Sequence, residues 1–168
     1  SVALSLIFFL GIINSFNFID GINGLSSGVG IIVSCTYALW FYFFEEELFL
    51  ILALAIAGSQ LAFLPYNLVK AKIFMGDSGS MILGFLSAIL TIYFLQVNER
   101  AVDVVLLKID AMVFSFSVLI IPLIDTLRVV FIRVFILKKS PFSADRNHIH
   151  HALLDIGLGH SQASLLLM

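Results

Sequence analysis

The chain has little charge, little cysteine and no sign of a secretion signal. Charged residues make up 12% of its 168 positions, and 9 Lys and Arg against 11 Asp and Glu leave a formal net charge of −2. No nucleic-acid partner is expected. The single cysteine, Cys35, excludes a disulfide within the chain. The first apolar run is not preceded by the basic segment of a signal peptide.

Most of the remaining residues are apolar. They account for 61% of the chain, and the mean hydropathy is +1.11, far above the range of soluble proteins. The sequence therefore indicates an all-α, polytopic transmembrane helical bundle. About five apolar runs are long enough to cross a bilayer core of roughly 30 Å, and the fifth is expected to kink at Pro122. They are the tail of a run that ends near Gly11, then 25–44, 48–68, 80–97 and 112–137.

The chain reads as one membrane-embedded domain over residues 1–168, without internal repeats. It opens inside an apolar run, and its last residues, "HSQASLLLM", resemble the start of another helix. Both ends are therefore expected to be truncated. The composition does not choose an oligomeric state, and a homodimer is compatible with it.

The distribution of basic residues predicts the orientation, because Lys and Arg collect in cytoplasmic loops. The loops at 12–24 and 69–79 and the region 125–160 hold seven of the nine, whereas the loops at 45–47 and 98–111 hold two. The first group is therefore expected to face the cytoplasm, and every unusual polar stretch of the chain lies in it. The seven are Lys70, Lys72, Arg128, Arg133, Lys138, Lys139 and Arg146.

The first polar stretch, "NSFNFIDGINGLSSG" at 14–28, places an acid and several amides at the end of an apolar run. Asn14 and Asn17 share a helix face, Asp20 follows, and Gly21 and Gly24 end the helix. One interpretation is a functional carboxylate at the membrane rim. The other is a helix end and a turn, which the same residue types favour. The glycine spacing does not make a nucleotide loop, because no strand precedes it and no Lys-Ser/Thr follows.

The second stretch, "FMGDSGSM", puts Asp77 between two glycines just before the fourth run. Asp77 or a neighbouring serine can cap the helix. Alternatively, its carboxylate can bind magnesium, with water and substrate phosphates as the other ligands. Asn67, Lys70 and Lys72 add polar and positive groups that suit a phosphate-bearing substrate.

The third stretch, "DRNHIHH", gathers His148, His150 and His151 beside Arg146. Such a cluster can bind a transition metal, exchange protons or hydrogen-bond to phosphate. No cysteine accompanies it, which makes a structural zinc site the weaker alternative. A basic turn that meets anionic headgroups of the lipid bilayer is the plain alternative.

Together these stretches resemble the polyprenyl-phosphate N-acetylhexosamine-1-phosphate transferases (glycosyltransferase family 4). "NSFNFIDGINGL" is similar to the family's N-x-x-N-x-x-D-G-x-D-G-L signature, and "IFMGDSGS" to its F-x-G-D-x-G-S signature. "HIHH" is similar to the family's cytoplasmic histidine motif. The form "DRNHIHH" is most like the undecaprenyl-phosphate N-acetylglucosaminyl-1-phosphate transferases, since the muramoyl-pentapeptide branch more often carries three adjacent histidines. Order and spacing match over nearly the whole chain.

The resemblance implies a reaction at the cytoplasmic face of the bacterial inner membrane. Undecaprenyl phosphate would attack the β-phosphate of a UDP-N-acetylhexosamine and release UMP, which begins the synthesis of a cell-wall or surface polysaccharide. The cofactor would be Mg²⁺, with Mn²⁺ as an alternative. Asp77 would bind the metal, and Asp20 and His148 would be catalytic. The substrate ligands would be Asn17, Asn67, Arg146, His150 and His151.

Two departures from the family pattern limit what carries over. Asn23 stands where the family has a second aspartate, so no carboxylate role is assigned there. The family's paired-aspartate motif belongs to an earlier loop that this stretch does not contain, so the chain alone is expected to be inactive. The alternative function is a transporter or metal-handling membrane protein that uses the same histidines and acids. Such a protein should place ionisable groups near mid-membrane, whereas here they lie at span ends. A membrane scaffold would leave the three polar stretches unexplained.

Overall fold

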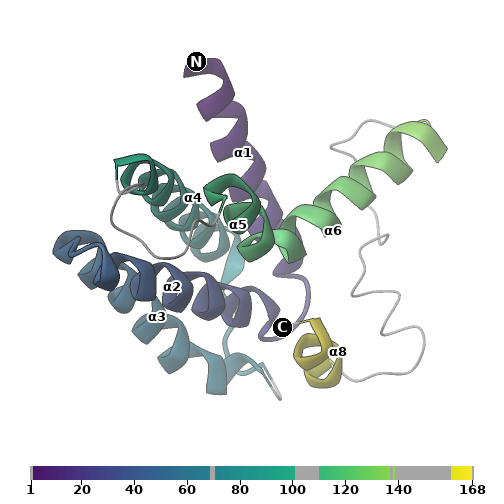
Figure 1. Cartoon of the computed structure of the whole chain (residues 1–168). Coiled ribbons are helices and arrows are strands. Elements are labelled where there is room, and N and C mark those ends of the chain that lie inside the picture. The colour runs from purple at the N-terminus through teal and green to yellow at the C-terminus, as the bar shows by residue number, and fades with distance from the viewer. Residues whose placement is uncertain (1, 69–70, 101–109, 137, 139–159, 168) are drawn as a thin grey trace.

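The fold is helical throughout the part of the chain that the computed structural model describes, which is residues 2–68, 71–100, 110–136, 138 and 160–167 (Figure 1). Three long helices form the main body with α1, and shorter helices pack against one side of it. The elements are α1 (Val2–Ile19), α2 (Leu25–Phe43), α3 (Glu47–Asn67), α4 (Gly76–Arg100), α5 (Ala111–Val118), α6 (Ile120–Phe131), the π-helix η1 (Ile132–Ile136) and α8 (His160–Leu167).

Three of these helices, α2, α3 and α4, are long and apolar enough to cross a membrane. The first predicted run extends beyond Gly11, because α1 continues through Asn14 and Asn17 to Ile19. Within the described residues of α1 the apolar stretch covers Ser5–Ile19, which is shorter than a full span. The chain is therefore a membrane protein with several candidate spans, fewer by these criteria than the five that the sequence suggests.

The fifth predicted run is interrupted, but three residues earlier than Pro122. Helix α5 ends at Val118, Leu119 leaves helical geometry at φ −98° and ψ 12°, and α6 starts at Ile120. Pro122 therefore sits in the first turn of α6, where its missing N–H is not needed. Its ring would collide with the carbonyl four residues earlier in a continuous helix, which explains a break at this point.

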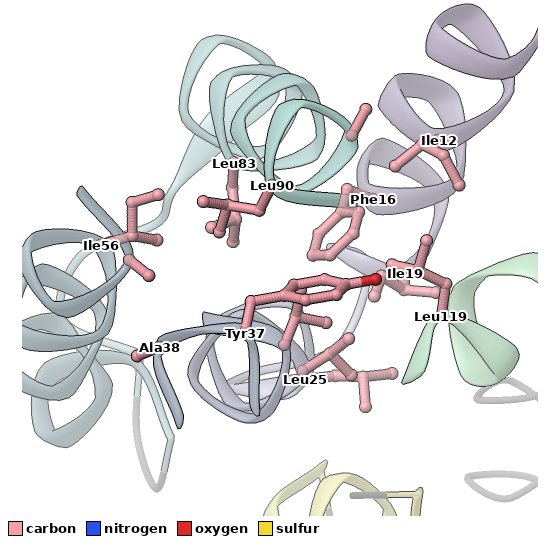
Figure 2. Close-up of a cluster of buried hydrophobic side chains, with 14 of the residues drawn as sticks. Ile12, Phe16, Ile19, Leu25, Tyr37, Ala38, Ile56, Leu83, Leu90 and Leu119 are labelled. Carbon is pink, nitrogen blue, oxygen red and sulfur yellow. The ribbon is translucent and has the colours of Figure 1, made fainter. Parts of the chain in front are cut away.

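The core lies where α1, α2 and α4 meet (Figure 2). Phe16, Tyr37 and Leu90 are fully buried there. Gly84 lets α4 approach α1 closely, because an added Cβ would lie 2.9 Å from the Cα of Ile13. Small residues at such crossings are typical of helix pairs in membranes.

Helix α6 projects away from this body (Figure 1) and is polar on its inner side. Asp125 is buried, and the hydroxyl of Thr126 donates a hydrogen bond of 2.9 Å to Ser15 of α1. The outer side of the helix exposes Ile124, Leu127 and Phe131. An apolar outer face with a polar inner face is the pattern of a helix that faces lipid.

Candidate active site

The turn between α1 and α2 is built around a glycine. Gly24 caps the start of α2 at φ 80°, a left-handed conformation that favours glycine. An added Cβ would also lie 2.5 Å from the Cδ1 of Leu68 and 3.3 Å from its Cα. The turn can therefore press against the end of α3 only if this position has no side chain.

Asn67 joins this turn to the segment that precedes α4. Its Oδ1 accepts a hydrogen bond of 2.5 Å from the backbone N–H of Gly24, and its Nδ2 donates one of 2.9 Å to the carbonyl of Ile73. The side chain is only 5% exposed. Both ends of the amide are thus engaged inside the protein, which gives Asn67 a bracing position between the two polar loops.

Asp20 follows the last residue of α1 and is half-buried in the turn. Its backbone N–H donates to the carbonyl of Asn17 at 3.3 Å, a bond to the third residue back that ends α1 in a tight turn. Its Oδ1 accepts a hydrogen bond of 2.5 Å from the hydroxyl of Ser26 in the first turn of α2. The predicted carboxylate is therefore held in place by a side chain from the next helix.

Asp77 is the second residue of α4 and is exposed. None of the described residues donates a hydrogen bond to its carboxylate, so it does not act as a side-chain cap for its own helix. The hydroxyl of Ser80 turns back to the carbonyls of Gly76 and Asp77 at 3.1 and 3.2 Å. The first turn of a helix also carries unpaired backbone amides, which favour negative charge nearby.

The charge of Asp77 acts on Asp20 across the turn. Burial raises the pKa of the Asp20 carboxyl, and the negative charge of Asp77 raises it further, while the Ser26 hydrogen bond lowers it. Met75 lies between the loops, with its sulfur 3.8 Å from the Ser26 hydroxyl. The charge of Asp77 thus acts on an acid that is 57 residues away in the chain.

Of the two acids, Asp77 could hold a divalent cation that shares its coordination with a substrate. Magnesium binds through one or two carboxylates and takes water and phosphate oxygens as its other ligands. The exposed Asp77 carboxylate, with no protein donor among the described residues, meets that requirement. Among all the residues that the structure describes, no three histidine, cysteine or acidic side chains are close enough together to enclose a metal.

The other predicted residues have mixed outcomes. Asn17 is half-buried one turn before Asp20, and its role as a substrate ligand stays a prediction. Asn23 uses its backbone carbonyl to accept a hydrogen bond of 2.5 Å from Ser164 of α8, which follows the histidine stretch. The histidines and Arg146 lie outside the described residues. They are His148, His150 and His151.

Two residues of this region escaped the sequence analysis, and the exposure of a third was not predicted. Ser26 looked like part of a helix start, because only the fold turns its hydroxyl to Asp20. Arg133 was counted only for its charge, yet it is buried with its guanidinium 5.5 Å from the ring of Phe18, two residues before Asp20. Phe74 is 77% exposed three residues before Asp77 and helps to line a cavity of about 330 Å³ between α3 and α4. The sequence analysis included Phe74 only as part of the "IFMGDSGS" signature, and that pattern gave no signal of the exposure of its side chain.

Comparison with known proteins places these features in one family. Residues 1–95 match the sequence model of glycosyl transferase family 4. The chain is 37% identical to a probable undecaprenyl-phosphate N-acetylglucosaminyl 1-phosphate transferase of Bacillus subtilis over 98% of this chain and 43% of that protein. It is 35% identical to the decaprenyl-phosphate N-acetylglucosaminephosphotransferase of Mycolicibacterium smegmatis, over 99% of this chain and 44% of that protein.

A more distant relative gives the same result. The undecaprenyl-phosphate alpha-N-acetylglucosaminyl 1-phosphate transferase of Escherichia coli is 30% identical over 92% of this chain and 41% of its own length. The chain therefore spans less than half the length of these relatives. Both carboxylate loops lie within the residues that match the family.

Proposed function

Because the chain belongs to glycosyl transferase family 4, we propose that the full-length protein transfers N-acetylglucosamine 1-phosphate from UDP-N-acetylglucosamine to a polyprenyl phosphate. An oxygen of the lipid phosphate attacks the β-phosphorus of the UDP-sugar. The bond between that phosphorus and the bridging oxygen breaks, and UMP leaves with the bridging oxygen. The product is a polyprenyl diphosphate-linked sugar. We propose undecaprenyl phosphate as the lipid, because the histidine stretch is most like that of the undecaprenyl-phosphate transferases.

The observation that carries the proposal is the pairing of Asp20 with Asp77 at one end of the α2–α3 hairpin. Transfer between two anions requires neutralisation of charge and alignment of the reacting groups. Asp77 would hold a magnesium ion, which when bound neutralises diphosphate charge. Asp20, half-buried and with a raised pKa, is suited to hold or pass a proton beside the diphosphate. His148 is proposed as the second catalytic residue, and Arg146, His150 and His151 as ligands of the phosphates.

The arrangement of charge supports a site on the cytoplasmic side of the bacterial inner membrane. Asp20 and Asp77 lie at the same end of the helical body as Lys72. The sequence assigns seven of the nine basic residues to that side, although two of them, Arg128 and Arg133, lie in α6 and η1 and not in a loop. We propose five membrane passages for this part of the protein. They are α1 to α4 and a broken fifth passage made of α5, α6 and η1. The apolar outer face of α6 then lies in the lipid.

The test uses the full-length protein in membranes with undecaprenyl phosphate, radiolabelled UDP-N-acetylglucosamine and magnesium. We expect UMP release and a labelled product that extracts into organic solvent. Asp77→Asn should reduce the rate at least about a hundredfold, as loss of a metal ligand does. Asp110→Asn is the matched control, because this exposed acid only caps α5 and asparagine caps equally well. Absence of any lipid-linked product would refute the activity, and near-normal turnover of Asp77→Asn would remove Asp77 as the metal ligand.

A further inference from the structure

Ser26 is a buried hydroxyl directed at an acid instead of at its own helix. It is the second residue of α2 and 1% exposed, and its hydroxyl donates a short hydrogen bond to Oδ1 of Asp20, with the weaker sulfur acceptor of Met75 at 3.8 Å. Serine at a helix start normally bonds to nearby backbone amides. Here Gly24 occupies the capping position, so the Ser26 hydroxyl is available to another group.

We propose that Ser26 is a positioning residue that fixes the carboxylate of Asp20 beside the loop of Asp77. The proposal rests on the proposed transferase activity and extends it to a residue that the sequence signatures do not include. With Oδ1 held at 2.5 Å, rotation of the carboxylate is restricted and Oδ2 keeps one orientation. Met75, 3.8 Å from the same hydroxyl, packs Ser26 against the segment that leads to Asp77.

The electrostatics of the turn show why a donor is needed here. Asp20 is half-buried and faces the negative charge of Asp77 from α4, and both effects disfavour its charged form. The Ser26 hydrogen bond opposes them. Without it, the carboxylate can rotate away from the loop of Asp77, which disturbs its alignment with a substrate.

The neighbouring residue supplies a matched control. Ser27 is also fully buried in α2, but its hydroxyl has no hydrogen-bond partner among the described residues. Ser26→Ala and Ser27→Ala therefore remove the same atom from adjacent buried positions, and only the first removes a contact with Asp20. Ser26→Thr keeps the hydroxyl and tests whether the hydrogen bond, and not the volume, matters.

The first measurement is steady-state turnover of UDP-N-acetylglucosamine by the full-length protein in membranes. Ser26→Ala should lower kcat about tenfold, as expected for loss of one hydrogen bond to a charged group, and change KM by less than about twofold. Ser26→Thr should recover most of kcat, and Ser27→Ala should match the unmodified protein. Equal effects of Ser26→Ala and Ser27→Ala would overturn the proposal.

The second measurement is independent of transferase activity. Dicyclohexylcarbodiimide reacts with protonated carboxyl groups in apolar surroundings, and mass spectrometry of peptides locates the product. Asp20 in Ser26→Ala should be labelled about tenfold faster at neutral pH than in the unmodified protein or Ser27→Ala, because the charged form has lost its donor. Equal labelling in all three would contradict the Ser26 contact. If labelling differs but no variant releases UMP, the proposed function fails while the contact stands.

Discussion

Asp20 is destabilising where it lies, because burial and the charge of Asp77 both raise the pKa of its carboxyl above the ordinary value of 3.8. The folded protein therefore binds this proton more tightly than the unfolded chain does. Above the unfolded pKa, stability falls as pH rises through the interval between the two pKa values, and it stays lower at neutral pH. A functional group kept at such a cost is common in active sites.

Replacement of this acid by its neutral isostere should separate stability from activity. Asp20→Asn keeps an oxygen that can accept from Ser26 but removes the buried charge. We expect a higher melting temperature than the unmodified protein at pH 7, a difference that shrinks toward pH 4, and loss of transferase activity. Thermal unfolding in detergent at both pH values measures this. A variant with a lower melting temperature at pH 7 would show that the charge is stabilised by its surroundings.

Gly24 gives a second residue-scale prediction. Gly24→Ala requires a left-handed conformation from alanine and forces a methyl group against Leu68, so it should destabilise the protein by about 1 to 3 kcal/mol. Gly58→Ala is the control, since an added Cβ at this helical position meets nothing within 4 Å. It should be neutral or stabilise by up to about 1 kcal/mol. Similar denaturation midpoints for the two variants would exclude strain at Gly24.

At this scale the sequence identifies the acids but not their supports. Asp20 and Asp77 stand out because a carboxylate in an apolar chain is rare, and the motifs around them match a family. Ser26 and Asn67 do not stand out as supports, because serine and asparagine are ordinary at helix ends. Their hydrogen bonds to Asp20 and Gly24 depend on side-chain direction, which only the packed structure defines.

At the scale of elements, α2 and α3 form a helical hairpin whose open end carries both polar loops. The Asn67 amide closes this end by joining Gly24 to Ile73. A substrate ligand would leave its amide facing the site, whereas Asn67 is buried with both ends in use. If Asn67 is a substrate ligand, its mutation should weaken substrate binding. If it is a brace between the loops, its mutation should lower the stability of the unliganded protein.

Asn67→Ala should destabilise the unliganded protein by about 2 to 4 kcal/mol, because it leaves the buried N–H of Gly24 and the part-buried carbonyl of Ile73 without partners. Asn14→Ala removes an amide whose Nδ2 donates only to Leu10 within α1, and it should cost less than about 1 kcal/mol. Chemical denaturation of both variants without substrate checks this. If Asn67→Ala raises KM but leaves the denaturation midpoint unchanged, Asn67 is a substrate ligand and not a brace.

The limits of the helices were predicted unevenly, for physical reasons. The predicted runs 25–44 and 48–68 agree with α2 and α3 within a residue, because polar turns bound them on both sides. The end of α1 was placed too early at Gly11, since glycine is tolerated inside membrane helices. The break before Pro122 was expected at the proline itself, but its ring acts on the turn before it.

At the scale of the whole molecule, the arrangement predicts that the two carboxylate loops are reached from one side only. The test starts from a full-length protein from which all native cysteines, Cys35 included, have been replaced by serine. In this background, Ser78→Cys should be protected in intact cells from a maleimide that does not cross membranes. Glu47→Cys, exposed at the opposite end of the helices, should be labelled. Labelling of both after permeabilisation is the control. The reverse pattern would place the site outside the cell and defeat the proposed use of UDP-sugars.

The brace at Asn67 also has a consequence for biosynthesis. Gly24, α2, α3 and Asn67 leave the ribosome in succession, and the contact that joins them spans 43 residues of chain. Helical hairpins form from local contacts and fold early. The aspartate half of the site can thus be assembled in the membrane while the codons for His148 to His151 are still untranslated. The nascent chain would then carry a preformed corner with both aspartate loops, and the histidine segment would be synthesised afterwards.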